Sequence, residues 1–244
     1  MRLMLYNICY GLGFDNQSSL VSKSPRYLLG YKRHLDTLAS YIKSTSPHIV
    51  GLVEVDMGSH RSAQINQAEY IADALGHYSI YACKYSKKSI HNYLPILRKQ
   101  GNAFLAAESV HGERFHYFDH GVKRLIIELE MQDYAIFLVH LSLQALHRRL
   151  QLRFLQELIE KTHKPVIVAG DLNTFKGTRE LTHFLHVTGM QSANTKNLKS
   201  FPSWQPRREL DFILYQDGIN INHFEIPDVR YSDHLPLICD FSLR

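Results

Sequence analysis

The stretch PVIVAGDLN, residues 165–173, carries the strongest local signal for the fold. Its continuous apolar run, Val-Ile-Val-Ala, predicts a strand that is buried on both faces. Gly170 then allows a close approach of two backbones, and Asp171 and Asn173 follow it directly. Polar side chains at the end of a buried strand indicate a functional edge of a sheet. A plain Asx turn that caps the next loop is the alternative.

Seven further runs are rich in β-branched, aromatic and Leu residues and predict strands in the same way. They cover residues 2–8, 48–55, 78–85, 124–131, 134–142, 210–215 and 235–243. Several of these runs are apolar on both faces. Such strands imply sheets that are covered on both sides.

Apolar residues at helical spacing predict four helices between these strands. They lie around Leu35–Ile42, over 66–75, over Leu146–Ile159 and near 178–187. Pro47 ends the first helix and Gly76 ends the second. Residues 11–30 and 84–100 are predicted to be surface loops.

Composition places the chain among globular proteins, with 244 residues of which 45% are hydrophobic. Because no Pro, Gly or Ser linker divides it, we expect one domain over 1–244. No segment is long and apolar enough to span a bilayer, and the first residues do not resemble a secretory signal, so we expect a cytoplasmic monomer. The three cysteines are far apart in sequence, which predicts free, buried thiols. Lys and Arg exceed Asp and Glu by five, a balance that suits a polyanionic substrate and is also common elsewhere.

Polar residues fall repeatedly at or near the ends of the predicted strands. They are Asn7, Glu54, His140, Asp171, Asn173, Asp211, Asp233 and His234. Taken singly, each is more often a cap or a turn residue than a catalyst. Taken together they have matching chemistry, and strand ends converge in a layered sheet.

The residue types in this set suit a metal-assisted reaction. A hard cation such as Mg²⁺ needs only one or two protein carboxylates, so Glu54 with an Asp or Asn from elsewhere suffices. His140 and His234 can shuttle a proton near neutral pH, and Asp211 could orient one of the two rings. A solvent-facing Glu54 and a purely structural hydrogen bond at Asn7 are the alternatives.

Seven segments, in order along nearly the whole chain, resemble the endonuclease/exonuclease/phosphatase superfamily of DNase I-like metal-dependent phosphoesterases. They are LYNICYG, IVGLVEVD, QGNAFLA, FLVHLS, VIVAGDLNTF, FPSWQPRRELDFIL and YSDHLPL. The resemblance implies an α/β fold with a four-layer sandwich, in which two mixed sheets pack face to face between helices. It also implies hydrolysis of a phosphoester by water with Mg²⁺ or Mn²⁺.

The resemblance further implies roles for individual residues. Glu54 would be the principal metal ligand, with Asn7 and Asp233 nearby. Catalysis would fall to His140, Asp171, Asn173, Asp211 and His234. Asn102, Arg124 and Trp204 are further candidates for substrate binding.

Several substrate classes fit the sequence. The basic segment 84–89 and Trp204, as a stacking platform, favour nucleic acid. A solvated loop is the alternative for the segment, and a Trp packed under the rim of the sandwich explains Trp204 equally well. A phospholipid diesterase of the sphingomyelinase type would use an apolar loop such as 90–97, and a small-molecule or inositol phosphatase would use a narrower cleft. An inactive binding module would have lost motif residues, whereas here every motif position holds a competent one.

Overall fold

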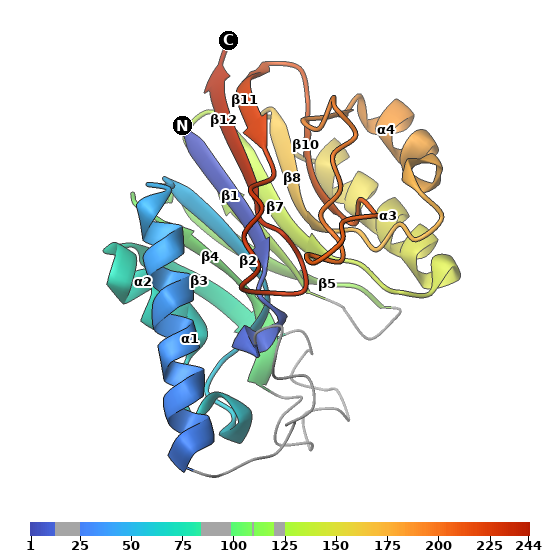
Figure 1. Cartoon of the computed structure of the whole chain (residues 1–244). Coiled ribbons are helices and arrows are strands. Elements are labelled where there is room, and N and C mark those ends of the chain that lie inside the picture. Colours follow the sequence, from blue (N-terminus) through green and yellow to red (C-terminus); the bar gives the residue numbers. More distant parts are fainter. Residues whose placement is uncertain (13–24, 84–98, 109, 120–124) are drawn as a thin grey trace.

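The computed structural model describes residues 1–12, 25–83, 99–108, 110–119 and 125–244, with the backbone alone for 25–29. Across these ranges two mixed six-stranded sheets lie face to face (Figure 1). The first sheet has the order β11–β12–β1–β2–β4–β3. Its strands are β1 (Arg2–Asn7), β2 (Ile49–Asp56), β3 (Tyr78–Cys83), β4 (Gln100–Ala106), β11 (Ile219–Glu225) and β12 (Leu237–Leu243).

The second sheet has the order β5–β6–β7–β8–β10–β9. Its strands are β5 (Gly112–Tyr117), β6 (Leu125–Glu130), β7 (Ala135–His140), β8 (Val166–Asp171), β9 (Gln191–Ser192) and β10 (Asp211–Tyr215). All eight strands expected from the sequence are therefore present, each within a few residues of its expected bounds. Arg124, at the start of one expected strand, lies outside the described residues.

Helices cover the outer face of each sheet. The helices α1 (Pro25–Ser44) and α2 (Gln67–Leu75) pack on the first sheet, and α3 (Ala145–Glu160) and α4 (Thr182–Thr188) pack on the second. A third apolar cluster fills the space between the sheets, where Leu5 and Phe104 of the first meet Leu138 and Ile167 of the second. The expected four-layer α/β sandwich is confirmed.

Local signals explain where the helices begin and end. Asn66 caps α2 by accepting a hydrogen bond from the amide of Ala68 (3.2 Å), and Gly76 ends it at a φ of +74°. The fourth expected helix is a 3₁₀ turn, η5 (Thr178–Leu181), that continues into α4. The surface loop expected over 11–30 is wrong for residues 25–30, because α1 already begins at Pro25. Pro suits the first position of a helix, where its missing N–H costs nothing.

Four strands were not expected, namely β4, β5, β9 and β11. β4 is fully buried but rich in Gly and Ala, and a Cβ at Gly101 would lie 2.0 Å from the carbonyl oxygen of Ala82. β5, β9 and β11 lie at sheet edges and are partly exposed, so their sequences lack a continuous apolar run. A strand with small side chains, or one at an exposed edge, lacks the run of large apolar residues from which strands are predicted.

Two simpler expectations can be checked in the described ranges. Cys9, Cys83 and Cys239 are free thiols, as expected, but Cys239 alone of the three is buried, whereas Cys9 and Cys83 are half-buried. Burial raises the pKa of Cys239 to about 12. In the part of the chain that the structure covers, no helix is long and apolar enough to cross a bilayer.

Candidate active site

Three polar residues lie side by side across the second sheet. β7 and β8 run parallel with His140 opposite Asp171, and β10 runs antiparallel to β8 with Asp211 also opposite Asp171. The approach of β7 and β8 depends on Gly170, where a Cβ would lie 2.0 Å from the carbonyl oxygen of Val139. The expectation that Gly170 permits close backbone packing is confirmed.

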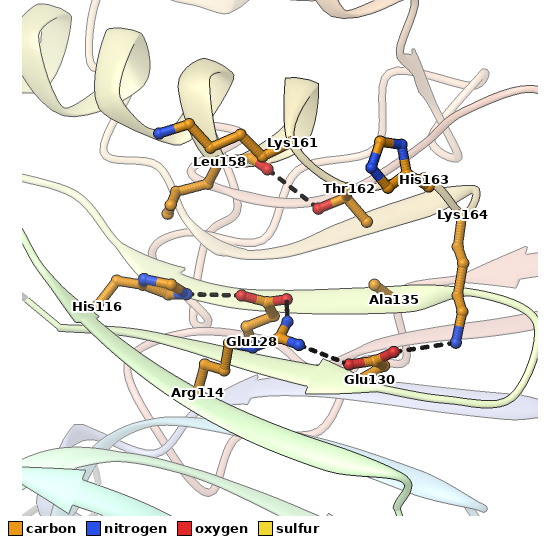
Figure 2. Close-up of a pocket in the computed structure, with 10 residues that line it drawn as sticks. All are labelled: Arg114, His116, Glu128, Glu130, Ala135, Leu158, Lys161, Thr162, His163 and Lys164. Carbon is orange, nitrogen blue, oxygen red and sulfur yellow. Dashed lines mark hydrogen bonds and ion pairs between the residues drawn. The ribbon is translucent and has the colours of Figure 1, made fainter.

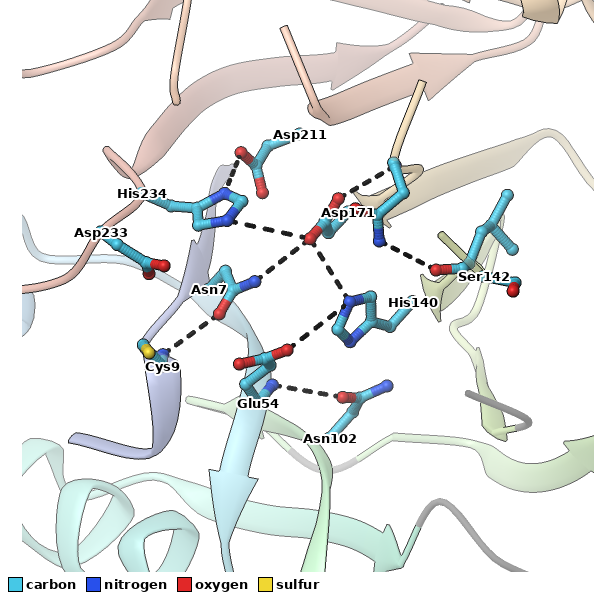
Figure 3. A network of polar contacts seen from close by, with 12 residues as sticks. Asn7, Cys9, Glu54, Asn102, His140, Ser142, Asp171, Asp211, Asp233 and His234 are labelled. Atoms are coloured by element: carbon cyan, nitrogen blue, oxygen red, sulfur yellow. Dashed lines mark hydrogen bonds and ion pairs between the residues drawn. The ribbon is translucent and has the colours of Figure 1, made fainter. Parts of the chain in front are cut away.

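Asp171 is the centre of this arrangement (Figure 3). Its Oδ2 accepts a hydrogen bond from Nδ2 of Asn7 (3.2 Å) and lies 3.3 Å from Nε2 of His140. Nε2 of His234 lies 4.0 Å from the same oxygen. One buried carboxylate oxygen thus faces three nitrogen-bearing side chains from both sheets and from the loop before β12.

Asp211 and His234 form a buried hydrogen-bonded pair. Nδ1 of His234 lies 2.7 Å from Oδ2 of Asp211, which also accepts a hydrogen bond from Oγ of Ser200 (2.6 Å). Burial alone would lower the pKa of His234, but Asp211, together with Asp171, outweighs burial and raises this pKa to about 10. Burial raises the pKa of Asp211, and His234 opposes that effect. The ring is therefore an imidazolium at neutral pH, with Nδ1–H directed at Asp211.

The turn after β8 holds Asp171 in place. The amide of Asn173 donates to Oδ1 of Asp171 (3.0 Å), so the Asx turn is built on Asp171. Asn173 has a φ of +51°, and its Nδ2 donates to the carbonyl of Leu141 (2.9 Å). Its side chain therefore fastens the ends of β7 and β8 to each other.

Glu54 reaches the same place from the first sheet. Val53 and Glu54 together oppose Asn102 of β4, which makes a β-bulge, and Glu54 has a φ of +57°. Its amide donates to Oδ1 of Asn102 (3.4 Å), and its Oε1 lies 3.8 Å from Nε2 of His140. In a regular strand successive side chains point to opposite faces, so Glu54 would point away from the second sheet if Val53 points towards it. The bulge breaks this alternation and turns Glu54 towards the second sheet.

Asn7 and Asp233 complete the set on the other side of Glu54. Oδ1 of Asn7 accepts from the amide of Cys9 (3.1 Å), and Oδ1 of Asp233 accepts from Oγ of Ser232 (3.2 Å). Burial raises the pKa of the Cys9 thiol, and the carboxylates of Asp233 and Glu54 raise it further. Both carboxylates therefore lie near Cys9.

The donor atoms fit a hard divalent cation. Among the described residues, Asp171, Asp211 and His234 form the one group of three His, Cys, Asp or Glu side chains whose ligand atoms lie within 4.8 Å of one another. Nδ1 of His234 is already engaged by Asp211, and the raised pKa of the ring opposes metal binding. Glu54 is the more open carboxylate, with 18% of its side chain exposed. The amide oxygen of Asn7 and the carboxylates of Glu54 and Asp233 are ligands of the type that Mg²⁺ or Mn²⁺ prefers.

The other expected residues are placed differently. Asn102 is buried, and its Oδ1 accepts a hydrogen bond from the amide of Glu54, so its side chain contacts the backbone of that residue. Trp204 is 42% exposed and follows Ser203, whose amide donates to the carbonyl of Asp233 (2.7 Å). Arg124 lies outside the described residues.

Sequence reasoning missed Ser200 and Phe201. Ser200 is fully buried against Asp211, and the ring of Phe201 packs on His234 with 4.7 Å between ring centroids. Both residues precede a polar segment that has no periodic pattern. Their position in the sequence, shortly before the expected strand over 210–215, is the one signal that could have identified them as site residues.

Comparison with known proteins identifies the family of the chain. The model of the endonuclease/exonuclease/phosphatase family matches residues 4–234. A family protein from Bacteroides thetaiotaomicron superposes with a TM-score of 0.75 at 12% identity, covering 100% of this chain and 98% of that one. A mannosyl-6-phosphatase from the same organism gives 0.75 at 13% identity, with 100% of both chains covered.

A human protein shares the same DNase I-like architecture. The catalytic domain of human Nocturnin, solved with a bound sulfate anion, gives a TM-score of 0.69 at 20% identity over 100% of this chain and 94% of that one. Identities this low show the fold alone, whereas the family match spans nearly every residue of the chain. The protein therefore belongs to the endonuclease/exonuclease/phosphatase family.

Proposed function

We propose that the protein hydrolyses a phosphodiester of nucleic acid with the help of Mg²⁺ or Mn²⁺, by attack of water on phosphorus. The observation that carries this proposal is the convergence on Asp171 of side chains from both sheets. Phosphoryl transfer needs an aligned nucleophile, charge stabilisation and a proton source, and it needs no covalent intermediate.

Asp171 is the candidate for orienting and deprotonating the water. Its Oδ1 is held by the amide of Asn173, and its Oδ2 faces the interior of the site. A fixed carboxylate of this kind acts as a general base within hydrogen-bond reach of the nucleophile. Asn173 holds Asp171 and also β7, so a change there would disturb the alignment of the base.

The two histidines are candidates for contacts with the phosphoryl group. His234, held as an imidazolium by Asp211, would donate its Nε2–H to a phosphoryl oxygen or to the leaving oxygen; this nitrogen lies 4.0 Å from Oδ2 of Asp171. His140 lies between Asp171 and Glu54 and is placed to donate to another phosphoryl oxygen. Preorganised donors of this kind stabilise charge as it develops in the transition state.

Glu54, Asn7 and Asp233 are the residues that would hold the cation. Asn102 and the bulge fix the backbone of Glu54, so this carboxylate is oriented before any ligand arrives. A bound Mg²⁺ or Mn²⁺ supplies Lewis-acid polarisation of the phosphoryl oxygens and neutralises their charge.

Surface residues near the site favour nucleic acid as the substrate. Trp204 is exposed on the segment that contacts the loop of Asp233, and the exposed Arg207 and Arg208 follow it. The guanidinium of Arg208 lies 5.1 Å from the centroid of the exposed ring of Phe175. Aromatic rings that stack on bases, beside arginines that bind phosphates, are typical of single-strand binding.

A phospholipid diester is the second candidate. Leu143 and Leu146 are 59% and 66% exposed and follow His140 by only three and six residues. Exposed apolar side chains at the rim of a site can enter a lipid surface. The solved mannosyl-6-phosphatase with the same fold adds small phosphoesters to the substrates that need testing.

A substrate panel with and without metal tests the proposal. Metal-depleted protein is assayed with added Mg²⁺ or Mn²⁺ on single- and double-stranded DNA, RNA, sphingomyelin, phosphoinositides and bis(p-nitrophenyl) phosphate. We expect metal-dependent cleavage of nucleic acid. Asp171→Asn should lower kcat by about 10²–10⁴-fold, because it removes the base.

The matched control is Asp217→Asn, which changes an exposed aspartate on the turn before β11. It should retain wild-type turnover. Cleavage of lipid alone would favour the second candidate. Full activity in Asp171→Asn, or no metal-dependent hydrolysis of any substrate, would contradict the proposed site.

A further inference from the structure

A groove of about 510 Å³ lies between α3 on one side and η5 with α4 on the other. Its walls carry Arg149 and Arg153 from α3 and Arg179 and His183 from the opposite side. The two helices pack against each other on the outer face of the second sheet (Figure 1). None of these four residues belongs to the candidate active site.

The positive charge of this groove is not balanced. Arg149, Arg153 and Arg179 are exposed, and within the described residues their guanidinium groups make no hydrogen bond or ion pair. Glu180 is the one acidic side chain in the lining, and its Oε2 is paired with the buried Arg148. Its Oε1 accepts the amide of Lys176 (2.8 Å). Three guanidinium groups therefore remain for an anionic ligand.

The floor of the groove is apolar. Leu152 and Phe184 are buried there, and Leu150 is 37% exposed at the side. A basic wall over an apolar floor suits a strand whose phosphates face the arginines and whose bases or sugars cover the floor. Arginine favours this because its planar fork binds phosphate in a bidentate manner.

The groove is continuous with the chain segments that carry the active site. Nη1 of Arg148 donates to the carbonyls of Ser142 (2.8 Å) and Leu143 (3.1 Å), two and three residues after His140. The same guanidinium is paired with Glu180, seven residues after Asn173. Arg148 thus fastens the groove to the ends of β7 and β8.

We infer that this groove binds the backbone of the nucleic-acid strand beyond the phosphodiester that is cleaved. The inference rests on the proposed function, since it assigns a second contact region to the same substrate. A strand is favoured over a protein or a membrane because three free arginines line one groove, and Arg148 connects its walls to the segment that follows His140. Each arginine contributes an ionic contact whose strength falls with salt.

A binding experiment without divalent metal tests the groove separately from catalysis. The affinity of a fluorescein-labelled 20-nucleotide single strand is measured by anisotropy at several salt concentrations, for wild type and for Arg149→Gln/Arg153→Gln/Arg179→Gln. We expect the variant to bind at least about tenfold more weakly. The plot of the logarithm of the binding constant against the logarithm of the salt concentration has a negative slope. The magnitude of this slope should decrease by about 2, as the loss of three ionic contacts predicts for a single strand.

The matched control is Lys43→Gln/Lys161→Gln/Arg244→Gln. It removes the same charge from positions that precede β2, precede β8 and follow β12, at the strand ends opposite the site. It should bind the strand as wild type does. Equal weakening by both triple variants would overturn the inference, because net charge alone would then explain it.

Turnover separates this inference from the proposed function. With metal added, the loss in kcat/KM relative to wild type should be several times larger for the 20-nucleotide strand than for bis(p-nitrophenyl) phosphate. If wild type cleaves the strand but the groove variant binds it equally well, the groove inference fails and the proposed function stands. If the arginines instead control binding of anionic vesicles or of an acidic peptide while strand affinity is unchanged, the inference is also overturned. If wild type cleaves no phosphoester, the proposed function itself fails.

Discussion

Asp211 is hydrogen-bonded to His234, whose Nε2 lies 4.0 Å from Oδ2 of Asp171. Its Oδ2 accepts from Oγ of Ser200 and contacts Nδ1 of His234, which leaves Nε2 directed towards Asp171. A buried carboxylate in this position fixes both the ring orientation and its charge. We therefore propose that Asp211 is a positioning residue and that Ser200 supports it.

We expect Asp211→Asn to lower kcat by about 10²-fold or more, because the ring loses its charged partner. KM should change much less, since the phosphate ligands remain. Ser200→Ala should lower kcat by less, because the Asp211–His234 contact survives. Steady-state kinetics on the substrate found in the panel measure this split. A rise in KM at constant kcat would contradict a positioning role for Asp211.

The candidate residues could be predicted from sequence where they interrupt apolar runs. Asp171 and His234 stand at the ends of such runs, and the structure brings them together. Whether they act as proposed stays a prediction. Ser200 and the supporting contact of Asn102 could not be predicted, because a serine in an irregular segment and an amide behind a bulge depend on tertiary packing. The positive φ of Glu54 likewise follows from the pairing of β2 with β4, which no local pattern encodes.

At the scale of elements, edge strands depend on charge as well as on apolar packing. On β5, Arg114 is paired with the buried Glu128 of β6 at 2.5 Å, and Nε2 of His116 lies 2.6 Å from the same carboxylate (Figure 2). Glu130 connects Arg114 to Lys164 near the start of β8. The network anchors a strand that has few buried apolar residues, which explains why its sequence does not resemble a strand.

A second ionic contact joins the first and last strands, and it gives a test that depends on pH. Arg2 of β1 binds Asp240 of β12 through two hydrogen bonds of 2.7 and 2.8 Å. The hydrogen bond from Arg2 lowers the pKa of Asp240 below its ordinary value of 3.8, although burial opposes this. A lowered carboxyl pKa contributes stability that is complete above the ordinary value and is lost as pH falls through the folded value.

We therefore expect Asp240→Asn to lower the free energy of unfolding by about 1 kcal/mol at pH 7, as for a partly exposed bidentate pair. The difference from wild type should stay constant down to about pH 4 and shrink below it. Urea unfolding of both proteins at pH 7, 4 and 3 measures this. Asp228→Asn, which changes the exposed pair with Arg230, serves as the control and should have a smaller effect at every pH. A difference that grows on acidification would contradict the assignment.

At the scale of the whole molecule, the site lies at the seam between the two sheets. Glu54 and Asn7 come from the first sheet, and His140, Asp171 and Asp211 come from the second. Their relative positions depend on the apolar layer between the sheets, because this layer sets the separation of the two sheets. The layered fold could be predicted from strands that are apolar on both faces. The distances across the seam could not, since they depend on how that layer packs.

A single domain over 1–244 remains a prediction, and unfolding tests it. The cluster between the sheets contains Phe104 of β4 and Leu138 of β7, both fully buried, so neither sheet can lose its partner without exposing apolar surface. We expect one urea transition, with far-UV circular dichroism and the fluorescence of Trp204, the only tryptophan, giving the same midpoint. Leu138→Ala should lower the free energy of unfolding by about 2–5 kcal/mol and shift both midpoints together. Separate transitions, or a shift confined to one probe, would show that the two sheets unfold independently.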